Sequence, residues 1–189
     1  KRENILVIGY PYLEMKRTKY KNIAKTDQVL FISQPTIGKQ LASFCLKLRN
    51  IQPRSISIAF KLHPAEMADW REQYGHLIDA GITVIDSNDP ELHLLQAQSR
   101  WQIGVYSTAL YEGCTFGCGT FLVQLPGVEY MTDFVASGFA KIVETAEEVQ
   151  LIDCNSMANS SEIFAVDWQS NWAEAVEEIE VSYRGRCVG

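Results

Sequence analysis

The chain has 189 residues, of which 47% are hydrophobic and 21% are charged, and its formal net charge at pH 7 is -6. This composition predicts a packed core rather than a disordered segment, and the length suits one domain. The acidic balance argues against a nucleic-acid-binding protein, which would carry a basic surface. It leaves open a site for a small phosphorylated ligand.

The sequence contains five cysteines, an odd number for a mid-sized chain. Disulfide frameworks belong to small secreted proteins, so this number favours a reducing, cytoplasmic compartment. Cys114 and Cys118 form a C-x3-C pair without a second pair at ligand spacing, so we expect small core residues there and no metal site. No run of about 18 apolar residues, as a membrane span requires, is present.

The chain begins at Lys1 without a methionine and enters an apolar strand pattern at residues 4–10. We therefore expect a single domain over residues 1–189, cut from a longer protein. A basic segment follows the first strand. It predicts either a solvated loop or frayed helix, or a basic patch that contacts an anionic membrane surface. Its basic residues are Lys16, Arg17, Lys19, Lys21 and Lys25.

Apolar runs and helical segments then alternate along the chain. The runs are nearly continuous rather than alternating, which is typical of strands covered by helices on both faces. The pattern predicts an α/β fold, a Rossmann-like three-layer sandwich with a mostly parallel sheet of about six or seven strands. Further strands are expected at 28–35, 55–64, 82–86, 101–107, 120–125 and 140–145, and helices at 36–50, 65–81, 89–98, 108–117, 128–138, 146–152 and 167–183.

Polar residues gather where these strands end. In an open parallel sheet, ligands bind outside the carboxyl ends of the strands, near a change in strand order. Each candidate also has a simpler interpretation as a helix cap, a turn residue or, for His63, a histidine bound to a backbone carbonyl. The candidates are Ser33 and Thr36 after the second strand, Lys61, His63 and Pro64 after the third, Asp86 after the fourth, and Ser107 and Thr108 after the fifth.

Together these groups predict a phosphate site. Ser107 and Thr108 begin a helix, and the free amides and positive dipole at a helix start attract phosphate. His63 would add a donor that stabilises the negative charge of a departing phosphate. Glu112, about one turn into the same helix, is an acceptor and suits ribose hydroxyls. The site requires His63 and the 107–108 pair to face one pocket.

Common nucleotide-binding and hydrolase motifs are absent, and the two other histidines indicate no site. No G-x-G-x-x-G follows the first strand, and neither a Walker A lysine motif nor a G-x-S-x-G elbow occurs. His76 and His93 lie in expected helices without a partner at metal or acid–base spacing. We expect both to be ordinary surface or packing residues.

Two short segments, "KLHP" and, further along, "YSTALYEG", resemble motifs in the nucleotide-binding half of GT-B glycosyltransferases. The likeness is greatest to bacterial sialyltransferases, polysialyltransferases and CDP-glycerol glycerophosphotransferase-like capsule enzymes, which carry a His-Pro motif and a Ser-Ser or Ser-Thr motif. "LFISQPTIG" is similar to the first strand-loop-helix of that half. The resemblance covers residues 4–150.

The resemblance implies that His63, Ser107 and Thr108 contact the nucleotide phosphate, with Lys61 and Asp86 near the base or ribose. It implies a nucleotide-activated donor, CMP- or CDP-linked, as substrate and no further cofactor. In the sialyltransferase group the catalytic base lies in an acidic-Gly motif of the amino-terminal domain, which does not precede Lys1. The chain is then expected to turn over little alone, and its partner is the absent acceptor domain. Trp168 and Trp172 would pack either against that domain or, as an equal alternative, in the core of this one.

Two alternatives stay open at this point. The same two-domain architecture occurs in sugar-nucleotide epimerases, so the chain is also compatible with half of such an enzyme. A non-catalytic Rossmann-like binding or interaction module would use the same residues only as caps and turns.

Overall fold

The computed structural model describes residues 9–151 and 171–179. Of the predicted strand at 4–10 only residues 9 and 10 are described, and they are not in a strand. Trp168 lies outside the described residues.

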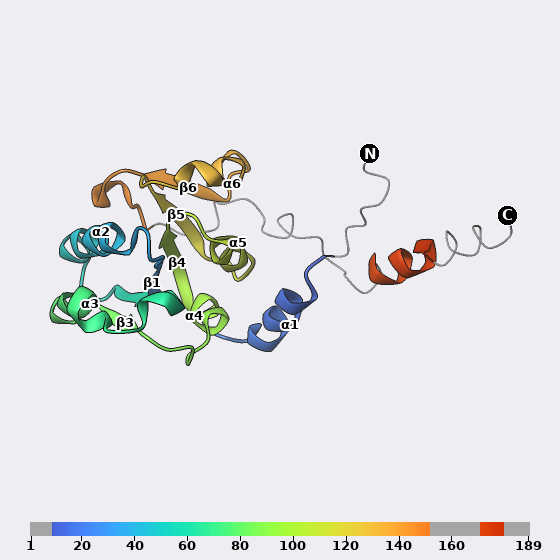
Figure 1. Ribbon diagram of the computed structural model, residues 1–189, viewed down its shortest axis with the longest axis horizontal. Helices are drawn as coiled ribbons and strands as arrows, with labels where there is room; N and C mark the ends of the chain where they lie inside the picture. Colours follow the sequence, from blue (N-terminus) through green and yellow to red (C-terminus); the bar gives the residue numbers. More distant parts are fainter. Residues whose placement is uncertain (1–8, 152–170, 180–189) are drawn as a thin grey trace, which may run out of the picture.

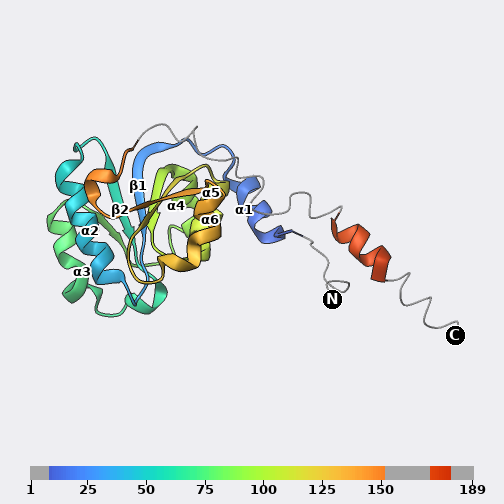
Figure 2. The ribbon, with the colours of Figure 1, turned by 90° about the horizontal axis from the view of Figure 1, so that it is seen from above.

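The body of the protein has three layers, with a central sheet between two sets of helices (Figures 1 and 2). Helices α2 (Gly38–Ile51) and α3 (Trp70–Asp79) cover one face, and α4 (Leu92–Gln98), α5 (Thr108–Thr115) and α6 (Thr132–Ala136) cover the other. The strands are β1 (Thr26–Ile32), β2 (Ser57–Lys61), β3 (Thr83–Ile85), β4 (Ser99–Gly104), β5 (Gly119–Val123) and β6 (Ala140–Val143).

All neighbouring strands of this sheet run parallel, in the order β3-β2-β1-β4-β5-β6. The predicted three-layer Rossmann-like fold is therefore confirmed. The order in which strands are added to the sheet reverses between β1 and β4. The chain adds β2 and β3 on one side of β1, and then returns to add β4, β5 and β6 on the other side. That reversal opens a crevice at the carboxyl ends of these two strands.

Large apolar side chains pack β1 and β2 against each other and against α3. Phe31 pairs with Phe60 in register, and their rings stack with centroids 6.0 Å apart. Phe60 also contacts Tyr74 of α3, with ring centroids 5.6 Å apart. Each such ring contributes about 1.5–3 kcal/mol through burial, so the strand that carries Lys61 and His63 to its end is firmly anchored.

The basic segment forms a regular helix, α1 (Pro11–Tyr20), rather than a loop. Proline at its first position has the backbone angle that a helix start requires. Lys16 and Lys19 form ion pairs with Glu91, at 2.5 and 2.7 Å, which join α1 to the start of α4. Hydrogen bonds from Lys16, Lys19 and Tyr20 lower the pKa of Glu91 to about 2. Arg17 also pairs with Glu14 at 3.7 Å, so three of the five basic residues form ion pairs within the protein.

Several predicted helices were wrong in their start or their extent. The helix expected from Asp89 begins at Leu92, with Glu91 as its N-cap. The helix expected over 65–81 is divided into a 3-10 turn, η1 (Pro64–Glu66), and α3, which begins after Asp69. Asp69 has a left-handed backbone, with φ of 51°, which breaks the helical path. The helix expected over 128–138 is likewise divided, into the 3-10 turn η2 (Val128–Met131) and α6, and the one expected over 146–152 is only the 3-10 turn η3 (Ala146–Glu148).

Gly113 allows α5 to lie directly on β4. A Cβ at this position would lie 1.9 Å from Oε1 of Gln102, a fully buried residue whose amide donates to Leu110 O at 2.7 Å and Thr120 Oγ1 at 2.8 Å. We expect Gly113→Ala to lower the free energy of unfolding by about 1–3 kcal/mol, because the amide must move from its partners. Urea unfolding measures this difference.

The matched control is Gly75→Ala in α3, where an added Cβ meets no atom within 4 Å. This change should raise stability by about 0.5–1 kcal/mol, because alanine loses less backbone entropy in a helix. Equal effects of the two substitutions would contradict the close contact at Gly113.

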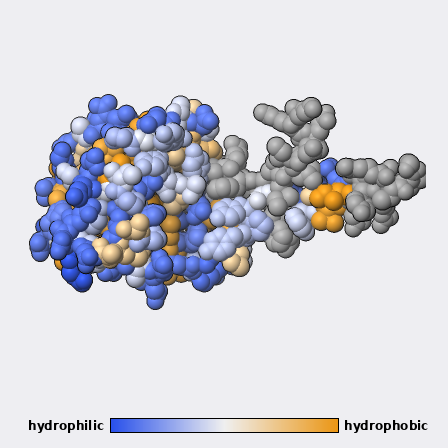
Figure 3. Space-filling model, viewed as in Figure 1, coloured by the Kyte–Doolittle hydropathy of each residue, from blue (hydrophilic) through white to orange (hydrophobic). Residues whose placement is uncertain are grey.

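Residues 171–179 form the described part of the predicted C-terminal helix. Trp172, Val176 and Ile179 are exposed along it, and Figure 3 shows hydrophobic surface on this helix. Within the described residues, no helix combines the length and apolar character that crossing a membrane requires.

Candidate functional site

A cavity of about 310 Å³ lies at the carboxyl ends of the central strands, beside the reversal between β1 and β4. This volume is at the lower end of the range for small-molecule sites, about 300–1,000 Å³. It is lined by the ends of β1 and β2 (Ile32, Ser33, Lys61, Leu62, His63, Pro64), the start of α4 (Asn88, Glu91, Leu92, His93), the start of α5 (Ser107, Ala109) and Tyr12 of α1.

His63 follows β2 and is held by a reciprocal capping box at η1. Its Nδ1 accepts a hydrogen bond from the Ala65 amide at 3.1 Å, and its own amide donates to Glu66 Oε2 at 3.0 Å. An Nδ1 that accepts carries no proton, so in the neutral ring the proton is on Nε2. The exposed His63 ring therefore presents an N–H donor even when it is uncharged.

Lys61 is a buried cation at the cavity, with 6% of its surface exposed. Its Nζ donates to Leu62 O at 3.0 Å, and no carboxylate lies within ion-pair distance of it among the described residues. Burial lowers the pKa of Lys61, and the charge of Asp86 partly opposes this effect. A buried charge without a counter-ion is costly, so an anion in the cavity would relieve the cost.

Ser107 is the N-cap of α5, and its Oγ accepts from the Ala109 amide at 3.3 Å. Ser107 and Ala109 line the same cavity as His63, so the geometric condition for a shared pocket is met for Ser107. Thr108 is exposed and stands outside the lining. The positive end of the α5 dipole is therefore at the cavity.

Beneath His63, the buried carboxylate of Glu66 ties three elements together. Its Oε1 accepts from Ser33 Oγ at 3.0 Å, after β1, and from the Tyr74 hydroxyl of α3. Burial first, and then this carboxylate, raise the pKa of Tyr74. A Cβ on Gly38 would lie 2.2 Å from both Glu66 Oε1 and the Tyr74 oxygen. Ser33 thus lines the cavity wall with its hydroxyl turned inward to Glu66.

Besides Thr108, three predicted site residues are not in the cavity lining. Asp86 is exposed and accepts a hydrogen bond from Trp70 Nε1 at 2.6 Å. Thr36 is exposed and hydrogen-bonds the Tyr106 hydroxyl. Glu112 lies behind the lining and contacts His93. Their binding roles stay predictions.

Sequence reasoning missed the role of His93. It was expected to be an ordinary surface or packing residue without a partner at acid–base spacing, but its Nε2 lies 3.1 Å from Glu112 Oε2. The two residues are on different helices and 19 positions apart, so no local spacing signals the pair. Glu66 had a signal: it stands three residues after His63, the spacing of a capping box.

A larger cavity, about 500 Å³, lies between α1 and the ends of α4 and α5. Its lining includes Glu14, Arg17, Lys21 and Lys25, and none of the predicted site residues. Lys25 donates there to the carbonyls of Gln96 and Ser99, at 2.9 and 2.6 Å, so its ammonium group is occupied by backbone carbonyls at the carboxyl end of α4. We place the functional site at the smaller cavity, where donors converge at the strand ends.

No group of three or more His, Cys, Asp or Glu side chains is arranged to hold a metal ion in the part of the chain that the structure describes. Cys45 and Cys114 are buried free thiols, and Cys118 is also buried. Burial raises the pKa of Cys114 to about 12, which keeps this thiol protonated and unreactive.

No protein-family model matches this sequence. No curated protein is significantly similar to it in sequence.

Solved structures resemble its fold. A UDP-GlcNAc 2-epimerase of Methanocaldococcus jannaschii, in complex with UDP-GlcNAc and UDP, aligns with a TM-score of 0.61 and 15% identity over 96% of this chain and 56% of that one. A second structure of that enzyme aligns with a TM-score of 0.58 and 14% identity, over 96% and 57% of the two chains. The glycosyltransferase WaaG, involved in lipopolysaccharide biosynthesis, reaches only 0.43 at 15% identity, over 86% and 46%.

At these identities the likeness is one of fold. The chain spans a little over half of the epimerase, 56% of its length. The narrower resemblance to sialyltransferases and CDP-glycerol glycerophosphotransferases stays a prediction. The comparisons therefore place this chain among Rossmann-like folds of the kind found in a nucleotide-sugar enzyme.

Proposed function

We propose that the cavity binds the phosphates of a nucleotide-activated sugar or glycerol, and that the chain is the donor-nucleotide-binding half of a GT-B-type transferase. The observation that carries this proposal is Lys61, a buried cation without a carboxylate partner among the described residues, at a cavity that His63 and Ser107 also line. Such a cation is costly unless an anion faces it.

In the reaction, these groups would stabilise the departing nucleotide. Breaking the bond to the sugar or glycerol leaves negative charge on the phosphate oxygen. Lys61 would neutralise it, His63 Nε2–H would donate to it, and the α5 dipole at Ser107 would favour it. The acceptor hydroxyl would be deprotonated by a base in another domain, in line with the resemblance to enzymes of cell-surface polysaccharide synthesis.

An epimerase half-domain is the second candidate, and the fold likeness to UDP-GlcNAc 2-epimerase favours it. That candidate predicts a preference for UDP, whereas the resemblance to sialyl- and glycerophosphotransferases predicts CMP or CDP. A non-catalytic module predicts no selective binding.

Contact of the basic segment with anionic membranes stays a separate proposal, which vesicle sedimentation tests.

Titration of the chain with CMP, CDP, UDP and GDP, followed by NMR of the histidine side chains, separates these candidates. Selective perturbation of His63 by one nucleotide is the expected result, and the base identifies the donor class. If none of the four nucleotides binds at millimolar concentration, the non-catalytic module is correct and the proposal is abandoned.

We expect His63→Ala to weaken nucleotide binding by about 1–3 kcal/mol, the usual loss for a hydrogen bond to a charged group. Calorimetric titration measures the change. His76→Ala is the matched control, because His76 is an exposed histidine of α3 and should leave the affinity unchanged. Unchanged affinity in His63→Ala would remove this residue from the site.

A further inference from the structure

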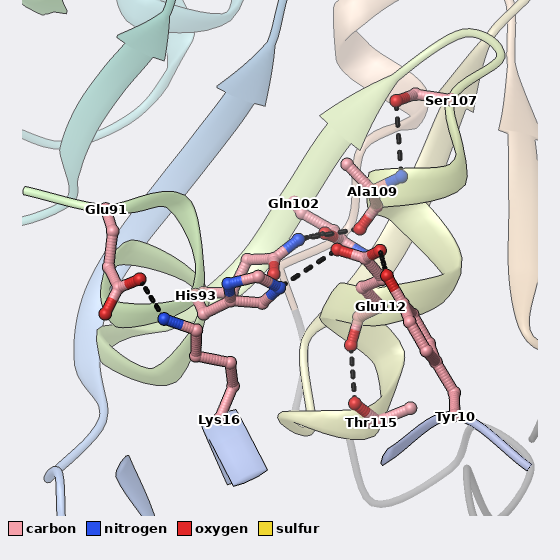
Figure 4. A network of polar contacts seen from close by, with 10 residues as sticks. Tyr10, Lys16, Glu91, His93, Gln102, Ser107, Ala109, Glu112 and Thr115 are labelled. Atoms are coloured by element: carbon pink, nitrogen blue, oxygen red, sulfur yellow. Dashed lines mark hydrogen bonds and ion pairs between the residues drawn. The ribbon is translucent and has the colours of Figure 1, made fainter. Parts of the chain in front are cut away.

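The cavity contains a second imidazole, that of His93 on α4. It has 7% of its surface exposed and lines the cavity with His63 and Lys61. Figure 4 shows its ring between α4 and α5, with Nε2 directed at the carboxylate of Glu112, 3.1 Å away. No hydrogen-bond partner of the other nitrogen, Nδ1, is found among the described residues.

The groups around His93 hold the ring in place from three sides. Glu112 contacts it from α5, and the Tyr12 ring from α1 stands edge-on at a centroid distance of 5.6 Å. The Phe116 ring lies 5.8 Å away. Such packing fixes the plane of the imidazole. A proton that the ring gains or loses therefore changes the charge at one defined position in the cavity wall.

Several charged and titratable groups surround this pair, and Lys61 is the one lysine among them that has no carboxylate partner in the described residues. Tyr10, before α1, donates to Glu112 Oε1 at 3.5 Å. Lys16 and Lys19 of α1 are paired with Glu91, which precedes His93. Lys61 and His63 share the cavity from the end of β2. Glu112 is thus the carboxylate that faces the ring directly, and it favours a proton on Nε2.

We propose that His93, oriented by Glu112, is a second contact to the phosphates of the nucleotide and takes up a proton when they bind. This inference rests on the proposed function. With Nε2–H directed at Glu112, Nδ1 is the nitrogen left for the cavity, and it changes from acceptor to donor when protonated. An anion in the cavity stabilises the protonated ring, so by linkage a proton enters as the anion binds.

This arrangement revises the role of Glu112. A carboxylate that accepts from His93 and Tyr10 lies behind the cavity wall rather than at its surface. Glu112 acts here as the positioning residue for His93. The group that the pair presents to the ligand is the imidazole.

Two pyrophosphate diesters, UDP-GlcNAc and CDP-glycerol, are suitable probes, because such diesters do not themselves titrate near neutral pH. Calorimetric titration in buffers of different ionisation enthalpy, between about pH 5.5 and 8, measures the protons taken up on binding. We expect uptake, with tighter binding at the acidic end. His93→Gln should abolish the His93 part of this uptake and weaken binding about tenfold at the acidic end, with little change at the alkaline end.

Two further variants separate the histidines. His63→Gln should retain the uptake that belongs to His93, and His76→Gln, on the exposed face of α3, should retain the whole effect. Glu112→Gln should reduce the part of the uptake that belongs to His93, because the carboxylate no longer orients the ring. A purely structural role of His93 would alter stability without altering proton uptake.

The outcomes distinguish the two proposals. If neither probe binds at millimolar concentration at any pH, and none of CMP, CDP, UDP and GDP binds either, the proposed function itself is wrong and this inference falls with it. If a probe binds and His93→Gln shows the wild-type proton uptake, the assignment of His93 is overturned while the nucleotide site stands.

Discussion

Glu66→Ala is expected to lower the free energy of unfolding by about 3–5 kcal/mol, because it leaves a buried hydroxyl, a buried phenol and a backbone amide without their acceptor. The carboxylate accepts from Ser33, Tyr74 and the His63 amide, and 8% of its surface is exposed. Urea unfolding followed by circular dichroism measures the loss. Glu66→Gln preserves the volume but replaces an acceptor oxygen with a donor, so it should show an intermediate loss.

The matched control is Glu72→Ala on the exposed surface of α3, where a change within about 0.5 kcal/mol is expected. Equal free energies of unfolding for Glu66→Ala and Glu72→Ala would show that the hydrogen bonds of Glu66 contribute nothing to stability. Where Glu66→Gln still folds, its nucleotide affinity should also fall, because the capping box that orients His63 is weakened.

Lys61→Met is expected to have opposite effects on stability and on binding. The buried ammonium has a backbone carbonyl as partner, so a thioether of similar length should make the unliganded protein more stable. The same change should weaken nucleotide binding roughly a hundredfold, since it removes a charge-assisted contact in a poorly solvated cavity. Thermal unfolding without nucleotide and calorimetric titration with it measure the two effects.

The pH dependence gives a second readout for Lys61. Its pKa in the folded protein is lowered below the ordinary value of 10.5 by burial, so the unfolded chain holds this proton more strongly. Stability is therefore reduced below the folded pKa and recovers as pH rises towards 10.5. The stability advantage of Lys61→Met should shrink over that alkaline window. Two results would refute the assignment of Lys61 as a buried cation that binds an anionic ligand. One is a stability difference between Lys61→Met and the wild type that does not change with pH, and the other is a loss of stability in Lys61→Met with unchanged nucleotide affinity.

Local pattern was sufficient for the six strands of the sheet and their order along the chain. Apolar runs such as "SISIAF" and "TFLVQL" are long enough to identify strands, and their continuity shows that both faces are covered. Proline and glycine mark most boundaries. The helix starts near Asp89 and Pro64 were misplaced, because a 3-10 turn, an irregular loop and a helix start share the same capping residues.

The sequence by itself determined the class of fold and the strand ends that carry Lys61, His63 and Ser107, because side-chain periodicity and capping are local properties of the chain. Only the tertiary structure decided which of these groups share a cavity, that Asp86 turns to Trp70, and that His93 meets Glu112. Such contacts depend on strand order and helix packing, which bring together residues far apart in sequence. Burial without a counter-ion, the property that singles out Lys61, exists only once those layers have closed around it.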